Sequence, residues 1–240
     1  FAIFAIVALG AGFFAGLSAT SPDMRLTCDT YFDEHGMHDI RLISTAGFTE
    51  ADLDALRAEP EISTVSPAYF ADLVVQNGEV EKVAHLLSLT DGVNTPELKE
   101  GRMPTSPDEC LLDSAAVEKF GFSLGDIILI PEDNKEETLE LISPRELKVV
   151  GIVSSPLYVT FDRGTSTIGS GSVDFFLLLP SETFTSDYYL EVYLTLKDTT
   201  SKNTFKEEYQ QLIDSAIPHL ETLGEERSEI RYQEIRDEAD

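Results

Sequence analysis

The sequence has no tryptophan, only two cysteines and no Asn-x-Ser/Thr glycosylation site. Cys28 and Cys110 lie far apart in the chain and form no CxxC motif. A disulfide between them is allowed outside the cell, but nothing in the sequence brings the two residues together. Two free or buried thiols are therefore the favoured interpretation.

Basic residues are also scarce. The 240 residues include 17 Lys and Arg against 44 Asp and Glu, which gives a formal net charge of −27. A chain this acidic is repelled by a phosphate backbone, so we expect no nucleic-acid partner. The same charge keeps it away from anionic lipid head groups except where an apolar segment anchors it. We interpret the acidity chiefly as a solubility feature.

The sequence motifs of two common enzyme classes are absent. The Gly-rich stretch from Arg163 to Ser172 lacks the Gly-Lys-Ser/Thr ending of a P-loop, and it leads into a strand instead of a helix. No serine stands in a Gly-x-Ser-x-Gly nucleophile elbow. We interpret the stretch as a structural loop in which glycine permits positive φ, and we predict no catalytic residue and no enzyme activity.

One short segment contains metal-ligand residue types. His35 and His38 are three positions apart, and the acidic residues beside them are Asp33, Glu34 and Asp39. A helix would place both imidazoles together, but Gly36 between them favours a turn. We therefore interpret the segment as a polar surface connector and predict no metal ligands and no cofactor. The other two histidines, His85 and His219, are isolated and are not predicted to be catalytic.

One long hydrophobic run is present, at the start of the chain. Residues 1–19 carry no charge and no strongly polar group before Ser18. Because about 20 apolar residues are needed to cross the hydrocarbon core, we predict that residues 1–20 are part of a transmembrane helix in contact with membrane lipid. Ser21-Pro22-Asp23 is expected to end it.

A secretory signal peptide is the alternative for this run, although no basic residue precedes it. In both cases the rest of the chain is expected outside the cytoplasm. The flank agrees, because only Arg25 lies nearby as a cation, whereas cytoplasmic flanks tend to carry several.

The chain then follows a strand, helix, strand pattern. Residues 39–44 alternate in the manner of a strand. Thr49 is predicted to cap a short helix with Leu53 and Leu56 on its apolar side, and Pro60 follows its end. A second strand is predicted from Val65 to about Gln76. This pattern is typical of a compact α+β lobe.

The middle of the chain differs in character. A loop rich in Gly, Pro and Thr from Gly92 to Pro107 precedes several short strands and one small helix. The helix is capped by Asp113 or Ser114 and ends at Gly121. The strands are predicted at residues 110–112, 127–130 and 147–153. Residues 91–155 are therefore predicted to form an inserted β-rich lobe.

After a long loop, residues 154–172, the first pattern returns. Strands are predicted at residues 173–179 and 188–196, followed by an amphipathic helix from Asn203 to about Leu220. We therefore predict an α+β fold in which residues 21–90 and 156–222 build one lobe around the inserted lobe. Residues 223–240 are strongly charged and have too few apolar positions to pack onto a globule. We interpret them as a solvated helix or as the start of a coiled coil.

The order and spacing of several short segments resemble FtsX-like ABC transporter permeases and their extracytoplasmic MacB-like periplasmic core domain. No single segment is specific, but together they cover nearly the whole chain. The segments are Ala-Thr-Ser-Pro-Asp-Met24, Tyr31-Phe-Asp-Glu, residues 39–53, Glu100-Gly-Arg-Met-Pro104, Leu124-Gly-Asp126, Val149-Val-Gly-Ile-Val153 and Arg163-Gly-Thr-Ser-Thr-Ile-Gly169.

The resemblance implies a porter-like split β-α-β lobe with an inserted β-rich lobe. It also implies no covalent chemistry in this domain. A separate cytoplasmic ABC ATPase subunit would hydrolyse ATP, and the permease would convert this into substrate export or mechanical signalling outside the membrane. A homodimer or pseudo-dimer is expected, with a peptide, a lipoprotein or a cell-wall hydrolase as partner. An acidic cleft between the lobes would suit cationic peptides.

The sequence departs from a complete permease because it contains a single membrane segment. The alternative interpretation is a membrane-tethered binding or adaptor module for a cell-wall enzyme or peptide. Both interpretations place the protein at the cell membrane with most of the chain outside the cytoplasm.

Overall fold

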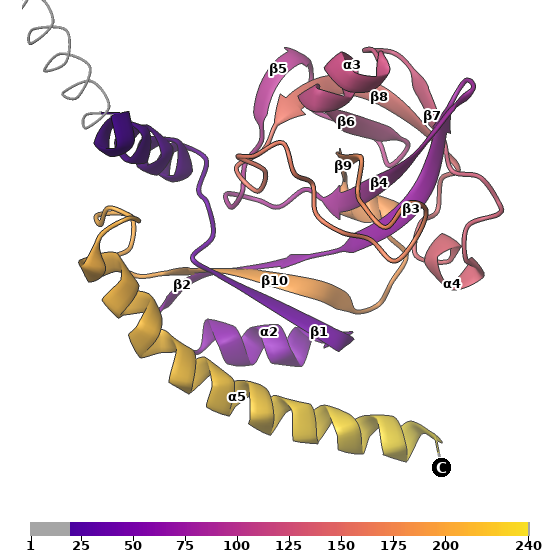
Figure 1. Ribbon diagram of the computed structural model, residues 1–240. Helices are drawn as coiled ribbons and strands as arrows, with labels where there is room; N and C mark the ends of the chain where they lie inside the picture. The colour runs from indigo at the N-terminus through magenta and orange to yellow at the C-terminus, as the bar shows by residue number, and fades with distance from the viewer. Residues whose placement is uncertain (1–19, 240) are drawn as a thin grey trace, which may run out of the picture.

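A computed structural model describes residues 20–239, and the predicted membrane run at residues 1–19 lies outside this range. Within the described range, no helix is both long enough and apolar enough to cross a bilayer. The architecture is mixed α+β, with two separate β-sheets and a long C-terminal helix (Figure 1).

The chain is helical over residues 20–34, so the predicted helix end at Ser21-Pro22-Asp23 was wrong. Proline lacks one N–H donor and disturbs the turn that precedes it, but it does not prevent the residues after it from being helical. The helix gives way to a turn at Gly36, which has a φ of +58°. A Cβ here would lie 2.6 Å from the Gly92 carbonyl oxygen, so the close approach of the two loops requires glycine.

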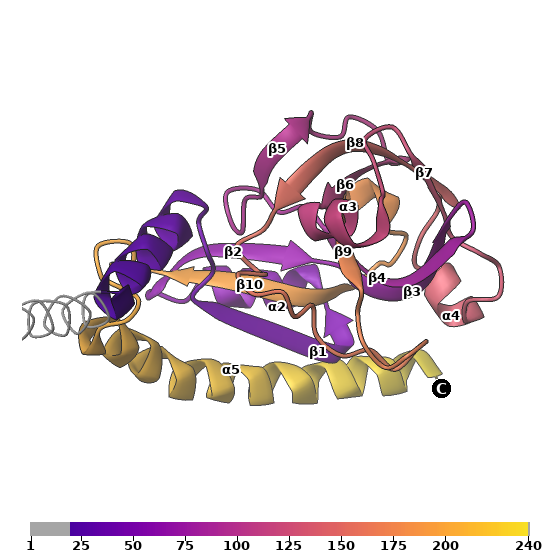
Figure 2. The ribbon, with the colours of Figure 1, turned by 45° about the horizontal axis from the view of Figure 1, so that its top comes forward.

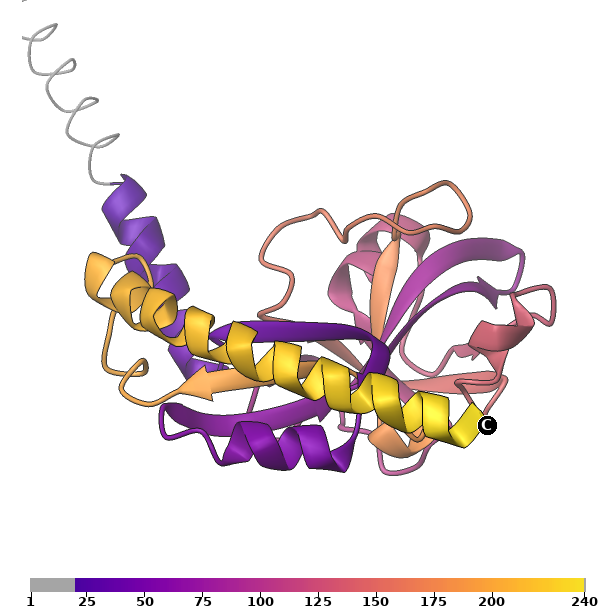
Figure 3. The ribbon, with the colours of Figure 1, turned by 90° about the horizontal axis from the view of Figure 1, so that it is seen from below.

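The first sheet has three antiparallel strands in the order β1-β10-β2. These are β1 (Ile40–Phe48), β2 (Ile62–Ala68) and β10 (Tyr189–Leu196). Two helices, α2 (Glu50–Arg57) and α5 (Glu207–Ala239), lie across one face of this sheet (Figure 3). Val192 and Leu194 of β10 pack there against Leu53 of α2 and Ile213 of α5. We call this unit the three-stranded lobe.

Helix α2 forms where the sequence predicted it, for the predicted reason. The Thr49 side chain accepts a hydrogen bond from the Asp52 amide, and the Asp52 carboxylate accepts one from the Thr49 amide. This reciprocal capping box satisfies two backbone groups that a helix start leaves open. Leu53 and Leu56 then face the sheet.

The second sheet has seven strands in the order β5-β8-β6-β9-β4-β3-β7, and β7 pairs with both β3 and β8. The sheet therefore closes on itself, as the curved strands in Figure 2 show, and we call it the barrel lobe. Its strands are β3 (Phe70–Asn77), β4 (Val80–Ser88), β5 (Glu97–Gly101), β6 (Glu109–Asp113), β7 (Ile127–Leu129), β8 (Glu146–Ser154) and β9 (Phe175–Leu179). The short helices in this part of the chain are α3 (Ser114–Phe120), α4 (Glu136–Leu139) and the 3-10 turn η1 (Ser181–Thr183).

The barrel is filled by alternate side chains of its strands. Phe175 and Leu177 of β9 point inward with Leu73, Leu86 and Leu147. The other face of β9 is covered as well, because Phe176 and Leu178 contact the loop that follows β8. All five residues of β9 are buried, which explains its continuous apolar run.

Three element predictions need correction. The strand predicted from Val65 to Gln76 is two strands, β2 and β3, which enter different sheets on either side of Tyr69. Helix α5 begins at Glu207 and not at Asn203, because Asn203 and Thr204 bind the N-terminal helix instead. The charged tail does pack: α5 continues through Pro218 and Gly224, and its side chains contact the three-stranded lobe.

Candidate functional site

The N-terminal helix is attached to the three-stranded lobe through one buried carboxylate. Asp29 is 8% exposed. It accepts hydrogen bonds from the Asn203 side chain at 2.5 Å and from the Thr204 amide at 2.6 Å. Phe32, one turn further on, lies over Phe205, with ring centroids 6.4 Å apart. The N-terminal helix is thus held against residues 203–205, which lead into α5.

The end of the same helix contacts the barrel side of the molecule. The connection from β4 to β5 bonds to it through three contacts: the Asn94 amide donates to the Gly36 carbonyl at 2.8 Å, the Thr95 amide donates to the His35 carbonyl at 2.8 Å, and the His35 ring bonds the Thr95 carbonyl at 2.8 Å. One helix therefore touches both lobes.

The histidines and acidic residues of residues 33–39, which are of metal-ligand type, serve this junction. The His38 ring bonds the Asn94 side chain at 2.9 Å, and burial lowers the pKa of His38 against the opposing effect of this bond. Asp39 accepts from the Tyr209 hydroxyl at 2.7 Å and from the Leu196 amide at 2.6 Å. Burial and the nearby Asp29 and Asp39 carboxylates raise the pKa of Asp33. Within residues 20–239, no cluster of three or more His, Cys, Asp or Glu is arranged to hold a metal ion.

A buried charge pair lies on the face of the three-stranded sheet opposite α2 and α5. Glu191 is fully buried and pairs with Arg41, and the Tyr193 hydroxyl donates to the same carboxylate at 2.6 Å. Burial acts against the charged form of Arg41, but the bond to Glu191 outweighs this effect and raises its pKa. Burial also raises the pKa of Tyr158, whose charge environment includes both Arg41 and Glu191. This cluster lies where the loop after β8 meets the three-stranded sheet, since Leu157 of that loop packs against Tyr193.

The Gly-rich loop from Arg163 to Ser172 is fastened to the barrel. The Arg163 Nε donates to Asp113 at 2.6 Å, and both side chains are more than nine-tenths buried. Its guanidinium also lies over the rings of Tyr158 and Phe176. Asp113 caps α3 as well, as the sequence indicated. The loop is therefore anchored at its first residue. Gly164, Gly169 and Gly171 have positive φ, as predicted for this stretch.

An Asp, a His and a Ser meet near this loop without forming a catalytic triad. The His85 Nδ1 lies 2.5 Å from Asp72, and Ser166 also bonds Asp72. A triad needs the serine on the other ring nitrogen of the histidine, whereas here the serine shares the aspartate. Burial raises the pKa of Asp72, but the bonds from His85 and Ser166 outweigh it and lower the pKa.

The remaining residues that the sequence singled out have separate surroundings. Cys28 is partly exposed, Cys110 is buried, and both are free thiols, as the sequence favoured. His219 of α5 lies between Glu59 and Glu61, at 3.2 and 3.3 Å from their carboxylates. These residues have structural contacts and do not converge on a common site.

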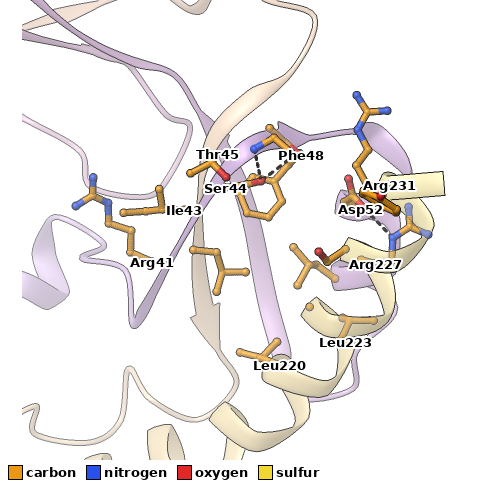
Figure 4. Close-up of a pocket in the computed structure, with 17 residues that line it drawn as sticks. Arg41, Ile43, Ser44, Thr45, Phe48, Asp52, Leu220, Leu223, Arg227 and Arg231 are labelled. Atoms are coloured by element: carbon orange, nitrogen blue, oxygen red, sulfur yellow. Dashed lines mark hydrogen bonds and ion pairs between the residues drawn. The ribbon is translucent and has the colours of Figure 1, made fainter. Parts of the chain in front are cut away.

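A groove of about 600 Å³ lies between β1 and α5, as Figure 4 shows. Its apolar lining includes Leu42, Leu220 and Leu223. Three arginines, Arg41, Arg227 and Arg231, also line it, and Asp52 is its only acidic lining residue within the described part of the chain. This groove is not the expected acidic cleft between the lobes, because three arginines and one acidic residue line it.

Sequence reasoning missed Asp29, Glu191 and Arg231. Each lies among many similar charged residues, and only the packing of distant segments buries them. The amphipathic helix pattern could have indicated that α5 covers a sheet, but not that its charged half borders a groove.

The two-lobed α+β arrangement, together with the sequence of residues 1–212, identifies the class of protein. Residues 1–212 match the family described as the MacB-like periplasmic core domain. The chain belongs to this family, which provides the periplasmic or extracellular domain of ABC transporter permeases.

Two solved structures are similar in part. One is the extracellular domain of the noncanonic ABC-type transporter YknZ from Gram-positive bacteria, with 17% identity and a TM-score of 0.43 over 72% of this chain and 86% of that one. The other is the periplasmic region of MacB from Actinobacillus actinomycetemcomitans, with 16% identity and a TM-score of 0.42 over 73% and 75% of the two chains. A search of curated proteins finds no match to this sequence.

Proposed function

We propose that this domain converts ATP hydrolysis by a cytoplasmic partner subunit into relative movement of its two lobes outside the membrane. The observation that carries the proposal is the double attachment of the N-terminal helix. Asp29 bonds the segment that leads into α5, while residues 35 and 36 bond the β4–β5 connection. A helix displaced by the membrane part of a permease would therefore act on both lobes at once.

The two sheets support movement as separate bodies. The chain passes directly between the sheets from β2 to β3 and from β9 to β10, and each sheet has its own buried cluster. The pairing of residues 70–88 and 175–179 in the barrel supports a division of the lobes near Tyr69 and Phe184, outside the predicted insertion at residues 91–155. We propose that the lobe containing β1, β2 and β10 is the porter-like unit.

The proposed partners follow from this arrangement. They are a cytoplasmic ABC ATPase, membrane lipid around residues 1–20, and a second copy of the permease or a related one. A peptide, lipoprotein or cell-wall hydrolase outside the membrane would receive the work, and the charged end of α5 would continue as a coiled coil. The domain itself needs no catalytic residue for this function.

The test uses the full-length protein with its ATPase in lipid nanodiscs. Spin labels at Ala51→Cys on α2 and Glu118→Cys on α3, in a Cys28→Ser background, report the distance between the lobes. We expect ATP to shift the distance distribution. Asp29→Ala should abolish most of the shift because it removes the bonds to Asn203 and Thr204.

The control is Asp23→Ala, an exposed aspartate of the same helix, which should leave the shift intact. A distance distribution that ATP does not change would reject the proposal. Purification of the protein without any associated ATPase would instead favour the tethered adaptor.

A further inference from the structure

The groove between β1 and α5 runs along the free edge of a β-strand. Strand β1 is at the end of the order β1-β10-β2, and no described strand pairs with its outer edge. Every residue from Arg41 to Phe48 lines the groove. A cavity over one face of a sheet would be lined by alternate residues, so this continuous lining indicates that the groove follows the strand edge.

The strand is also partly released from its neighbour. The pairing of β1 with β10 is interrupted between Ile43 and Phe48. Instead, the Ala46 amide donates to the Ser44 hydroxyl at 3.2 Å, and Thr45 and Ala46 are exposed. Up to this interruption, the outer edge of β1 presents backbone groups of the kind with which an extended peptide can pair.

The lining of the groove is rich in arginine, unlike the chain as a whole. Three arginines and one aspartate line it, although acidic residues outnumber Lys and Arg by 44 to 17 overall. Arg41 is already paired with Glu191 and Arg227 with Asp52, whereas the carboxylate that contacts Arg231, Glu234, is exposed. Arg227 and Arg231 are four positions apart on α5, so they project from the same side of the helix, at the end of the groove near Phe48 (Figure 4). An acidic side chain is the complementary partner.

Arg231 lacks part of its expected bonding. Its side chain is 12% exposed, and its Nε is buried without a hydrogen-bond partner among the described residues. The guanidinium contacts the exposed Glu234 at 3.2 Å and lies 4.5 Å from the centre of the Tyr188 ring. A buried, unpaired guanidinium nitrogen is costly, and Arg227 by contrast already has Asp52 as a partner at 2.6 Å.

We propose that this groove binds an extended peptide segment with acidic side chains, which adds to the edge of β1 while its carboxylates face Arg231 and Arg227. The apolar residues of the groove, such as Leu220 and Leu223, would contact the alternate side chains of the peptide. This goes beyond the coupling function and does not depend on it, because peptide binding requires no ATPase.

The test measures fluorescence anisotropy with the chain and a labelled hexapeptide of alternating valine and glutamate. A matched valine–lysine peptide tests charge. A valine–glutamate peptide with N-methyl groups on alternate residues tests pairing with the strand edge. We expect the lysine peptide to bind about tenfold more weakly or worse, and the N-methylated peptide to lose binding.

The protein variants separate the groove from general electrostatics. Arg231→Gln should weaken binding of the glutamate peptide about tenfold. Arg236→Gln, the same charge change at an exposed position of α5 outside the groove, should leave the affinity within about twofold. Thermal unfolding of both variants checks that the fold is retained.

Equal affinity for the glutamate and lysine peptides, or for the wild type and Arg231→Gln, would overturn the proposal. So would a dimer in sedimentation velocity that Arg231→Gln dissociates in the absence of any peptide binding, because the occupant would then be a second copy of the chain.

Discussion

The two lobes obtain their cores in different ways. The barrel lobe closes its own sheet, since β7 joins β3 to β8, and its inward side chains need few contributions from elsewhere. The three-stranded lobe has two open edges, and its core depends on α2 and on α5, which comes from the far end of the chain. The barrel is therefore suited to act as a rigid body, while the small sheet is the part that the chain ends can control.

The largest expected effect comes from a substitution that creates a cavity in the barrel core, which tests whether the two lobes unfold separately. Phe175→Ala should lower the free energy of unfolding by about 3–5 kcal/mol, because Phe175 is completely buried among Phe120 and Phe122. Calorimetry should show the barrel transition moving to lower temperature while the transition of the three-stranded lobe stays. Leu194→Ala, at a buried position of the three-stranded lobe, should lower the transition temperature of that lobe and leave the barrel transition unchanged. A single transition that moves equally in both variants would mean that the lobes unfold together.

The next effect concerns the loop that Arg163 fastens to the barrel. Arg163→Ala leaves Asp113 buried without its partner, so we expect a loss of about 3 kcal/mol in denaturant unfolding. Arg57→Ala removes an exposed pair with Asp54 and should cost less than about 0.5 kcal/mol. If the two variants are equally stable, the buried pair does not hold the loop.

The turn after the N-terminal helix gives a smaller effect. Gly36→Ala combines a φ of +58° with a Cβ 2.6 Å from the Gly92 carbonyl, so it should cost about 2 kcal/mol. Gly78 has a similar φ of +60° but nothing within 4 Å of its Cβ position. Gly78→Ala should therefore cost about 1 kcal/mol. Equal costs in equilibrium unfolding would show that the two loops can separate freely.

Local signals in the sequence predicted many elements correctly. Thr49 and Asp113 cap the predicted helices, and Gly121 ends one of them in the left-handed conformation. Strands β8 and β10 match predicted strands closely, and β1 includes the predicted strand from Ile40 onward. These features depend on interactions between residues close in the chain, so a sequence can reveal them.

What the sequence could not reveal depends on distant contacts. Val65 to about Gln76 was predicted as one strand, and only the pairing of its two halves with β10 and with β4 separates them at Tyr69. The tail of α5 looked too polar to pack, yet Arg227 reaches Asp52, 175 positions earlier. Long charged side chains cover a surface with their apolar stems, which hydrophobic periodicity does not count.

The smallest expected effect tests whether the contact between Arg227 and Asp52 stabilises the three-stranded lobe. Asp52 accepts bonds from the Thr49 amide at 2.7 Å and from Arg227 at 2.6 Å. Asp52→Asn should cost about 1 kcal/mol at neutral pH, because the amide keeps the shape but not the charge. Asp54→Asn, an exposed neighbour on α2, is the matched control and should be nearly neutral.

The pH dependence decides whether the charge of Asp52 is responsible. Burial would raise its pKa, but the bonds from Thr49 and Arg227 outweigh this effect and lower it. A lowered pKa means that the folded state favours the carboxylate, so its stabilisation is complete above the unfolded pKa of about 3.9 and is lost as the pH falls through the folded pKa. The difference between wild type and Asp52→Asn should thus be constant from about pH 8 to 5 and shrink below about pH 4. A difference that persists unchanged in acid would assign the effect to the shape of the cap, and α5 would then be held on the small sheet by its apolar contacts alone.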